Sequence, residues 1–193
     1  MSRTTRKLAK AGDVEGLIAV LRAGPEKERA AALDAIFECM ETQADRVKEL
    51  RRSILEACLP MVREPDHRVR AASVFIAITL RDPSASSVVV GALSDPSPDV
   101  RLRAVLGVFH LQPPGCLDDV LRLLRSDEDQ HVRAFAAAAI ERIGDASSVP
   151  ALLEARAHEP EPRVREAIDE VVAILEGRHP PTPIEPFMED PGA

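Results

Sequence analysis

The stretch DPSPDVRLRAVLGV, residues 95–108, decides the fold because the chain repeats it. Related segments occur at residues 67–80 (HRVRAASVFIAITL), 130–143 (QHVRAFAAAAIERI) and 162–175 (PRVREAIDEVVAIL). Each segment contains a Val-Arg pair, and successive pairs lie 31, 32 and 32 residues apart, with the valines at Val69, Val100, Val132 and Val164. A period of this length over four copies indicates a repeat architecture.

Small or apolar residues recur within each copy at four, seven, eight and eleven positions after the valine. This spacing places one apolar stripe along an α-helix, whereas a strand would alternate every second residue. The residues are Ser73, Ile76, Ala77 and Leu80, then Ala104, Gly107, Val108 and Leu111, then Ala136, Ala139, Ile140 and Ile143, and finally Ile168, Val171, Val172 and Leu175. The repeated segment is therefore predicted to be a helix.

A second apolar run follows the first three of these copies, after a turn that contains proline or glycine. The runs cover residues 88–93, 117–124 and 149–155. A weaker copy begins at Glu28-Arg29, and we expect it to be followed by a longer loop and a longer second helix at residues 47–59. Neither helix of such a unit can bury its stripe alone, so neighbouring units must stack.

The composition supports an all-α fold. The chain has no Trp and no Tyr, its aromatic fraction is 3%, and strong helix formers dominate. We predict an α-solenoid of about five to six stacked antiparallel helix pairs over residues 1–177. Its expected parts are an N-terminal cap at 12–27, a long atypical repeat at 28–64 and regular repeats at 65–177, followed by an extended proline-rich tail at 178–193.

Charged residues recur at fixed positions beside the valines. An acid lies five residues before each valine (Glu64, Asp95, Asp127 and Glu159), and an arginine follows each valine (Arg70, Arg101, Arg133 and Arg165). Arg29 occupies the arginine position of the weaker copy. We expect the acids and arginines to pair within or between repeats, where a series of pairs can fix the register. The alternative is a row of arginines that binds an anion.

The pattern Asp-Pro-x-x-x-Val-Arg, seen in residues 95–108 and again as EPEPRVREAIDEVV at 159–172, resembles HEAT repeats. It is especially similar to the short bacterial HEAT-like repeats of phycobilin lyase subunits, and the resemblance covers about residues 12–177. The resemblance implies that the second helices line a concave face on which a partner docks. The polar residues that it places there are Lys48, Arg51, Arg52, Glu56, Asp118, Asp119, Arg122, Arg125, Glu154 and Arg156.

Binding of another protein is the leading hypothesis for function. The chain would be an adaptor, scaffold or regulatory subunit without catalytic activity, since a groove of mixed charge suits a protein or peptide. The alternative is an accessory subunit of an enzyme similar to phycobilin lyases, which attach a bilin to an antenna protein. Nucleic-acid binding is a third, weaker hypothesis, because the net charge is −7 and aromatic residues for base stacking are scarce.

The sequence gives no pattern for catalysis, a metal or a cofactor, and we expect none of the three. The five histidines lack the i, i+4 pair of a helical zinc site, and no glycine-rich phosphate loop occurs. Three widely spaced cysteines, no 18-residue apolar stretch and no apolar signal core predict a cytoplasmic protein with reduced thiols and no membrane insertion. Cys39 is expected in the core.

The proline-rich tail contains apolar residues that are unusual for a solvated segment. They are Ile184, Phe187 and Met188. Two hypotheses remain open: the tail folds back on the last repeat or is plainly disordered, or these residues bind a partner.

Overall fold

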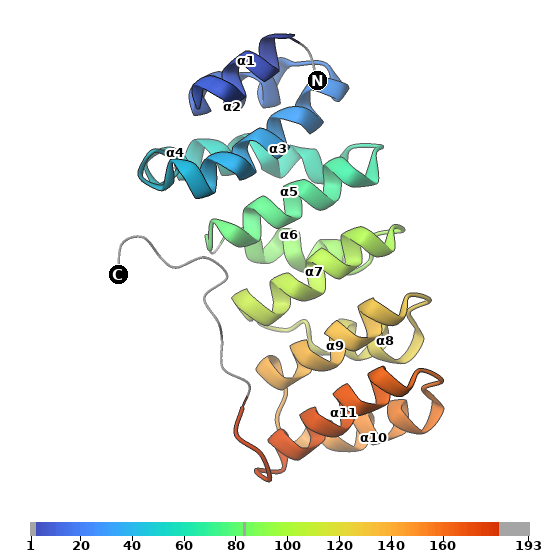
Figure 1. Cartoon of the computed structure of the whole chain (residues 1–193). Helices are drawn as coiled ribbons and strands as arrows, with labels where there is room; N and C mark the ends of the chain where they lie inside the picture. Colours follow the sequence, from blue (N-terminus) through green and yellow to red (C-terminus); the bar gives the residue numbers. More distant parts are fainter. Residues whose placement is uncertain (1–2, 83, 182–193) are drawn as a thin grey trace. The chain divides into compact units, whose positions relative to one another are not determined.

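The computed structural model describes residues 3–82 and 84–181 (Figure 1). Over these residues the chain contains eleven α-helices, two short 3-10 helices and no strand. The helices form two compact units, unit 1 up to residue 82 and unit 2 from residue 84. None of the described helices is long and apolar enough to cross a membrane.

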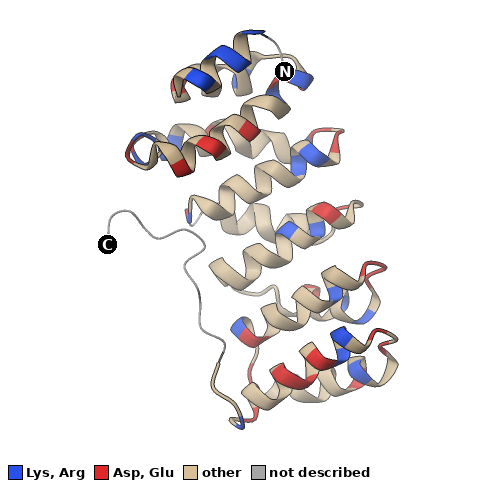
Figure 2. Ribbon diagram, in the orientation of Figure 1, with Lys and Arg blue, Asp and Glu red and all other residues tan. Residues whose placement is uncertain are grey.

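Unit 1 contains the first five α-helices, which are α1 (Arg3–Ala11), α2 (Val14–Ala23), α3 (Glu26–Thr42), α4 (Ala44–Cys58) and α5 (His67–Thr79), with the 3-10 helix η1 (Leu59–Arg63) after α4. Helix α2 packs against α3 and α4, and α3 packs against α5. Helix α1, which the sequence analysis did not predict, lies against α2 and α3. Its exposed residues are mostly basic, as Figure 2 shows, so α1 lacks the wide apolar stripe that marks the other helices.

Unit 2 contains the regular repeats. Its helices are α6 (Ala85–Ala92), α7 (Pro98–Leu111), α8 (Leu117–Ser126), α9 (Gln130–Ile143), α10 (Val149–His158) and α11 (Pro162–Leu175), with the 3-10 helix η2 (Ala146–Ser148) before α10. The first helices α7, α9 and α11 pack side by side. The second helices α6, α8 and α10 form another layer, in which each one packs against the first helix that follows it (Figure 1).

The repeated valines hold equivalent positions in the core. The exposed fractions of Val69, Val100, Val132 and Val164 are 1%, 1%, 0% and 2%. The residues four, seven and eight positions later are also buried in every copy, whereas those eleven positions later are half-buried in α7, α9 and α11. The prediction of stacked helices in an all-α solenoid is therefore confirmed, and Cys39 is buried as expected.

The atypical repeat of unit 1 differs from its prediction in one respect. Helix α4 has 15 residues against 8 to 10 in the second helices of unit 2, so the longer second helix is confirmed. The longer loop is wrong, because Gln43 alone separates α3 from α4. The additional residues lie in α3, which has 17 residues, and in η1, which continues the chain beyond α4.

Shortening one fully buried side chain should destabilise unit 2. Ile140 on α9 has no exposed surface, so Ile140→Ala is expected to lower the free energy of unfolding by about 2–5 kcal/mol through lost burial and a cavity. Phe135→Ala is the control on the same helix, because its side chain is 43% exposed and should cost less. Urea denaturation measures both, and equal losses would contradict this assignment of the core.

Candidate functional site

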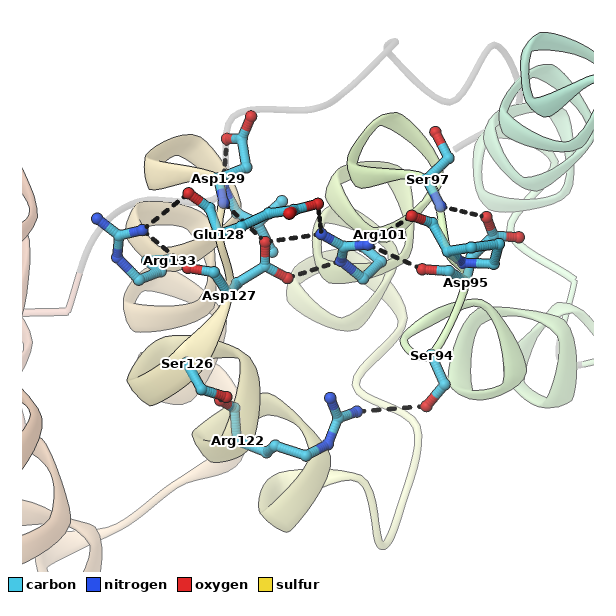
Figure 3. A network of polar contacts seen from close by, with 12 residues as sticks. Ser94, Asp95, Ser97, Arg101, Arg122, Ser126, Asp127, Glu128, Asp129 and Arg133 are labelled. Atoms are coloured by element: carbon cyan, nitrogen blue, oxygen red, sulfur yellow. Dashed lines mark hydrogen bonds and ion pairs between the residues drawn. The ribbon is translucent and has the colours of Figure 1, made fainter.

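Side chains and backbone of consecutive repeats meet in an arrangement that we call the arginine ladder (Figure 3). Arg101 donates from Nε and Nη2 to the two carboxylate oxygens of Asp127, at 2.6 and 2.9 Å. Its Nη1 donates to the carbonyl oxygens of Asp95 and Pro96, at 2.9 and 3.1 Å. One guanidinium thus binds the turn that precedes its own helix, α7, and also the acid that precedes α9, the first helix of the next repeat.

Arg133 repeats this geometry one unit later. Its Nε and Nη2 each lie 2.8 Å from a carboxylate oxygen of Glu159, and its Nη1 donates to the carbonyl oxygens of Asp127 and Glu128 at 2.8 and 3.4 Å. The exposed fractions are 10% for the Arg133 side chain and 3% for that of Glu159. The sequence prediction that these acids and arginines pair is confirmed, and the side-chain pairs join successive repeats.

The acids of the ladder also shape their own turns. Asp127 Oδ1 accepts a hydrogen bond from the amide of Asp129 at 3.0 Å, and Glu159 Oε1 accepts one from Glu161 at the same distance. Asp129 in turn caps α9, since its carboxylate accepts from the amides of His131 and Val132. Each buried carboxylate therefore has partners on both sides, as buried charge requires.

These contacts change the acidity of the groups involved. The hydrogen bonds from Arg133 are the main reason that the pKa of Glu159 lies below its usual value of 4.5. The same interaction raises the pKa of Arg133, and the bonds to Asp127 raise the pKa of Arg101. Because Arg101 and Arg133 each hold a carboxylate with Nε and Nη2, these guanidinium edges are not available to bind an added anion.

Unit 1 carries a related contact. Arg29 on α3 donates from Nη1 to the carbonyl oxygen of Gly24 at 2.8 Å and from Nη2 to Glu64 Oε1 at 2.7 Å. Arg70 donates from Nη1 to the carbonyl oxygens of Glu64 and Pro65, both at 2.9 Å. The carbonyl contacts therefore recur even where the repeat is atypical.

We call a group of exposed residues on α6, α8 and α10, together with Ser94 just after α6, the second-helix surface of unit 2. It consists of Ser87, Gly91 and Ser94, then Asp118, Arg122 and Arg125, and then Leu153 and Glu154. Arg125 Nη2 and Glu154 Oε2 lie 3.3 Å apart and link α8 to α10. Arg122 Nη2 donates to Ser94 Oγ at 3.3 Å, which links α8 to the end of α6 (Figure 3).

A polar cavity of about 350 Å³ lies between this surface and the ladder. Its lining residues are Ser94, Asp95, Arg101, Arg122, Leu123, Ser126, Asp127 and Glu128. Arg101 and Asp127 neutralise each other within it, and Asp95 and Glu128 add negative charge. The cavity therefore has no excess of positive charge and does not favour an anion.

The residues predicted to bind a partner fall into groups. Asp118, Asp119, Arg122, Arg125 and Glu154 lie together on α8 and α10, where Asp119 is half-buried and its carboxylate lies 3.5 Å from Arg122. Arg156 points elsewhere, because it pairs with Asp169 on α11, with Nη2 and Oδ2 at 2.8 Å.

The remaining predicted residues lie on α4 of unit 1. Lys48, Arg52 and Glu56 are exposed, and Arg52 pairs with Glu56 at 3.1 Å. Arg51 is half-buried and lies 3.8 Å from Asp82. Exposed ion pairs also link α4 to α2, from Arg46 to Glu15 and from Glu56 to Arg22.

Sequence reasoning missed four residues of the second-helix surface, which are Ser87, Gly91, Ser94 and Leu153. Leu153 is 47% exposed, although it belongs to the apolar run at residues 149–155. The helical period gives the signal, since Val149, Leu152 and Ala155 are buried, and Leu153 lies about 100° around α10 from Leu152, at the edge of the buried stripe. The predicted tail residues Ile184, Phe187 and Met188 lie outside the described residues.

The structure shows neither a metal site nor a reactive thiol over residues 3–82 and 84–181. No group of three or more His, Cys, Asp and Glu side chains is arranged there to hold a metal ion. The three cysteines are buried and free, and burial raises the pKa of Cys58 to about 12. A thiol with such a pKa is a poor nucleophile at neutral pH.

Comparison with solved structures places this arrangement among α-solenoid repeat proteins. A designed armadillo repeat protein in complex with the peptide (KR)4 is 20% identical with a TM-score of 0.65, over 87% of this chain and 85% of the other. The designed armadillo repeat protein YIII(Dq)4CqI gives 20% identity and a TM-score of 0.64, over 89% and 85%. A third structure, of computationally designed armadillo repeat proteins for modular peptide recognition, gives 20% and 0.65, over 87% and 84%.

The sequence profile of HEAT repeats matches residues 85–173, which are α6 to most of α11. The resemblance to HEAT repeats that the sequence predicts is thereby confirmed for this part of the chain. A search of curated proteins gave no match. The structural likenesses, at 20% identity, establish the fold.

Removing one partner of a ladder pair should be costly. Arg133→Gln leaves the Glu159 carboxylate buried without its cation, and we expect a loss of about 3 kcal/mol in the free energy of unfolding. Arg125→Gln is the matched control, because the Arg125–Glu154 pair is exposed and should contribute little. Similar losses in the two variants, measured by urea denaturation, would contradict the structural role of the ladder.

The ladder should also make stability depend on pH. Because the pKa of Glu159 is lower in the folded state than the usual 4.5, its contribution is complete above pH 4.5 and is lost as the pH falls through the lowered value. The stability difference between wild type and Glu159→Gln should therefore shrink as the pH decreases below 4.5. Glu154→Gln serves as the exposed control. A constant difference from pH 6 to pH 3 would show that the lowered pKa does not stabilise the fold.

Proposed function

We propose that the chain is a non-catalytic scaffold that binds a segment of a partner protein on the second-helix surface of unit 2. The observation that carries this proposal is the exposed Leu153 beside the Arg125–Glu154 pair. Together they offer an apolar anchor point with a cation and an anion next to it. Interfaces concentrate binding energy at such central contacts and use surrounding charges for orientation.

The charged residues of this surface can exchange partners at little cost. Their ion pairs are exposed, and exposed pairs typically contribute about 0–1 kcal/mol. Charges of an incoming peptide can replace them without uncovering a buried charge. The ladder pairs differ, because Asp127 and Glu159 are buried. The repeat thus separates the charges that hold the stack from those that are free to bind.

The similar solved structures add support of a general kind. One of them holds the peptide (KR)4, and another was designed for modular peptide recognition. They share the stack of helices with this chain, and the second-helix surface supplies acids and arginines that a peptide with charged side chains can pair with. A surface of mixed sign also suits a peptide better than the uniform charge of a nucleic acid.

The finer hypotheses from the sequence stay predictions. They are the role as adaptor or regulatory subunit, a cytoplasmic location, and the alternatives of an accessory subunit similar to phycobilin lyases or a nucleic-acid-binding protein. The proposal concerns only the binding of a polypeptide on a defined face.

A variant of the anchor residue tests the proposal. Peptides selected from a random library on the immobilised full chain would be measured by fluorescence anisotropy. Leu153→Asp should weaken the selected peptides by about tenfold or more, because it replaces the apolar contact with a charge.

Phe135→Asp is the matched control, since Phe135 is similarly exposed but lies on the first helix α9. Circular dichroism would verify that both variants keep the helical fold. If both variants bind as the wild type does, or if Phe135→Asp alone weakens binding, the second-helix surface is not the docking site.

A further inference from the structure

Helix α1 carries a row of cations along one face. A helix turns by about 100° per residue, so residues separated by three, four and seven positions fall on the same side. The four basic residues of α1 follow this spacing and are all exposed; they are Arg3, Arg6, Lys7 and Lys10. We call them the basic stripe of α1, which Figure 2 shows in blue. No acid lies between residues 3 and 11.

The opposite side of α1 packs against the rest of unit 1. Thr5 is buried there, and its hydroxyl donates to the carboxylate of Glu28 near the start of α3. Leu8 and Ala9 are half-buried on the same side, where α1 contacts α2 and α3. The basic stripe therefore faces away from these helices, and no ion pair joins it to an acid within residues 3–82 and 84–181.

Helix α3 carries a row of acids that is equally long. Asp34, Glu38 and Glu41 are exposed and are separated by four and three positions, so they form one acidic stripe, red in Figure 2. Partial burial of its carboxyl and the charge of Glu38 raise the pKa of Asp34 above its usual value of 3.8, whereas a nearby cation would lower it. In the part of the chain that the structure describes, these three carboxylates have no ion-pair partner.

The two stripes match in length and are opposite in sign. One extends from residue 3 to 10 and the other from 34 to 41, which is about 10 Å along a helix axis in both cases. No ion pair joins them within one copy. There, Thr5 holds α1 beside Glu28, and the acidic stripe begins six residues, about 9 Å, further along α3.

We propose that unit 1 binds unit 1 of a second copy of this chain, with the basic stripe of each α1 against the acidic stripe of the other copy's α3. Because α1 and α3 pack against each other, a twofold axis can bring both pairs of stripes together at once. Exposed ion pairs are individually weak, so the dimer is weak and depends on salt. This inference concerns unit 1 and goes beyond the peptide binding proposed for unit 2.

Other anionic partners fit this surface less well. A nucleic acid presents a long row of phosphates, which the acidic stripe on the neighbouring helix would repel. A helix that binds a lipid surface buries its apolar side in that surface, but the apolar side of α1 packs against α2 and α3. A second copy of the chain supplies carboxylates over the same length as the basic stripe.

Sedimentation velocity of the full chain tests the association. The wild type should dimerise at about 0.01 M salt, and its dissociation constant should rise by about tenfold or more at about 1 M salt, where exposed charges are screened. Two triple variants should each weaken the dimer at low salt, and they are Arg6→Glu/Lys7→Glu/Lys10→Glu and Asp34→Lys/Glu38→Lys/Glu41→Lys. The second variant should do so although it moves the net charge of −7 toward zero.

The matched control reverses three other exposed cations, on α4, η1 and α11, and should dimerise like the wild type. It is Lys48→Glu/Arg63→Glu/Arg163→Glu. Circular dichroism would verify that all three variants keep the helical fold.

A mixture of the two stripe variants gives the sharpest measurement. Each variant alone opposes like charges on α1 and α3, whereas in the mixture the α1 of either chain meets the opposite charge on the other chain's α3. The mixture should therefore form a heterodimer at low salt.

Three results would overturn the proposal. They are a monomeric wild type at low salt, a control that weakens the dimer as much as the stripe variants, and a mixture of helical stripe variants that stays monomeric. A monomeric wild type that the basic stripe retains on heparin would assign the stripe to a polyanion instead. The effect of Leu153→Asp on peptide binding is measured separately, so this inference and the proposed function fail independently.

Discussion

The arginine ladder between consecutive repeats is the interaction on which the regularity of unit 2 depends. Burial of apolar stripes drives the helices together, but apolar contacts tolerate sliding by a turn or a small rotation. Arg101 and Arg133 remove that freedom, because each binds two backbone carbonyl groups on one side and both oxygens of a buried carboxylate on the other. Their directional bonds define how far each repeat is displaced from the preceding one.

The arginine ladder also explains why buried charges lie in the turns and exposed charges lie on the second helices. The acids Asp127 and Glu159 are almost fully buried, and each accepts hydrogen bonds from an arginine and from an amide in its own turn. The second helices are left with exposed and weakly paired charges. A repeat built in this way can vary its outer residues with little effect on the stack, which is the property that a binding scaffold requires.

Much of the fold was predictable from the sequence, because the apolar stripe and the Val-Arg pair recur at a constant spacing. The partner of each arginine was predictable only in part, since the spacing alone did not distinguish pairing within a repeat from pairing between repeats. Helix α1 was missed because its exposed residues are basic and its buried residue is Thr5, so no apolar stripe marks it.

The candidate surface was less predictable than the fold. Arg122, Arg125 and Glu154 do lie together, but Arg156 pairs with Asp169, because a helix turns by about 100° per residue and places Arg156 away from Glu154. Leu153 could not be distinguished from the core by hydrophobicity, and only the position of its neighbours on α10 reveals its exposure.

Each pair of the arginine ladder takes its arginine from one repeat and its acid from the next. The pairing therefore does not depend on how many repeats the chain contains. Excision of residues 102–133 would join Arg101 to the remainder of α9 and present it to Glu159, the partner that Arg133 has now. Duplication of residues 102–133 would likewise add one complete arginine–acid pair. Insertion or removal of a whole repeat would therefore change the number of buried pairs but leave none of these buried charges without a partner.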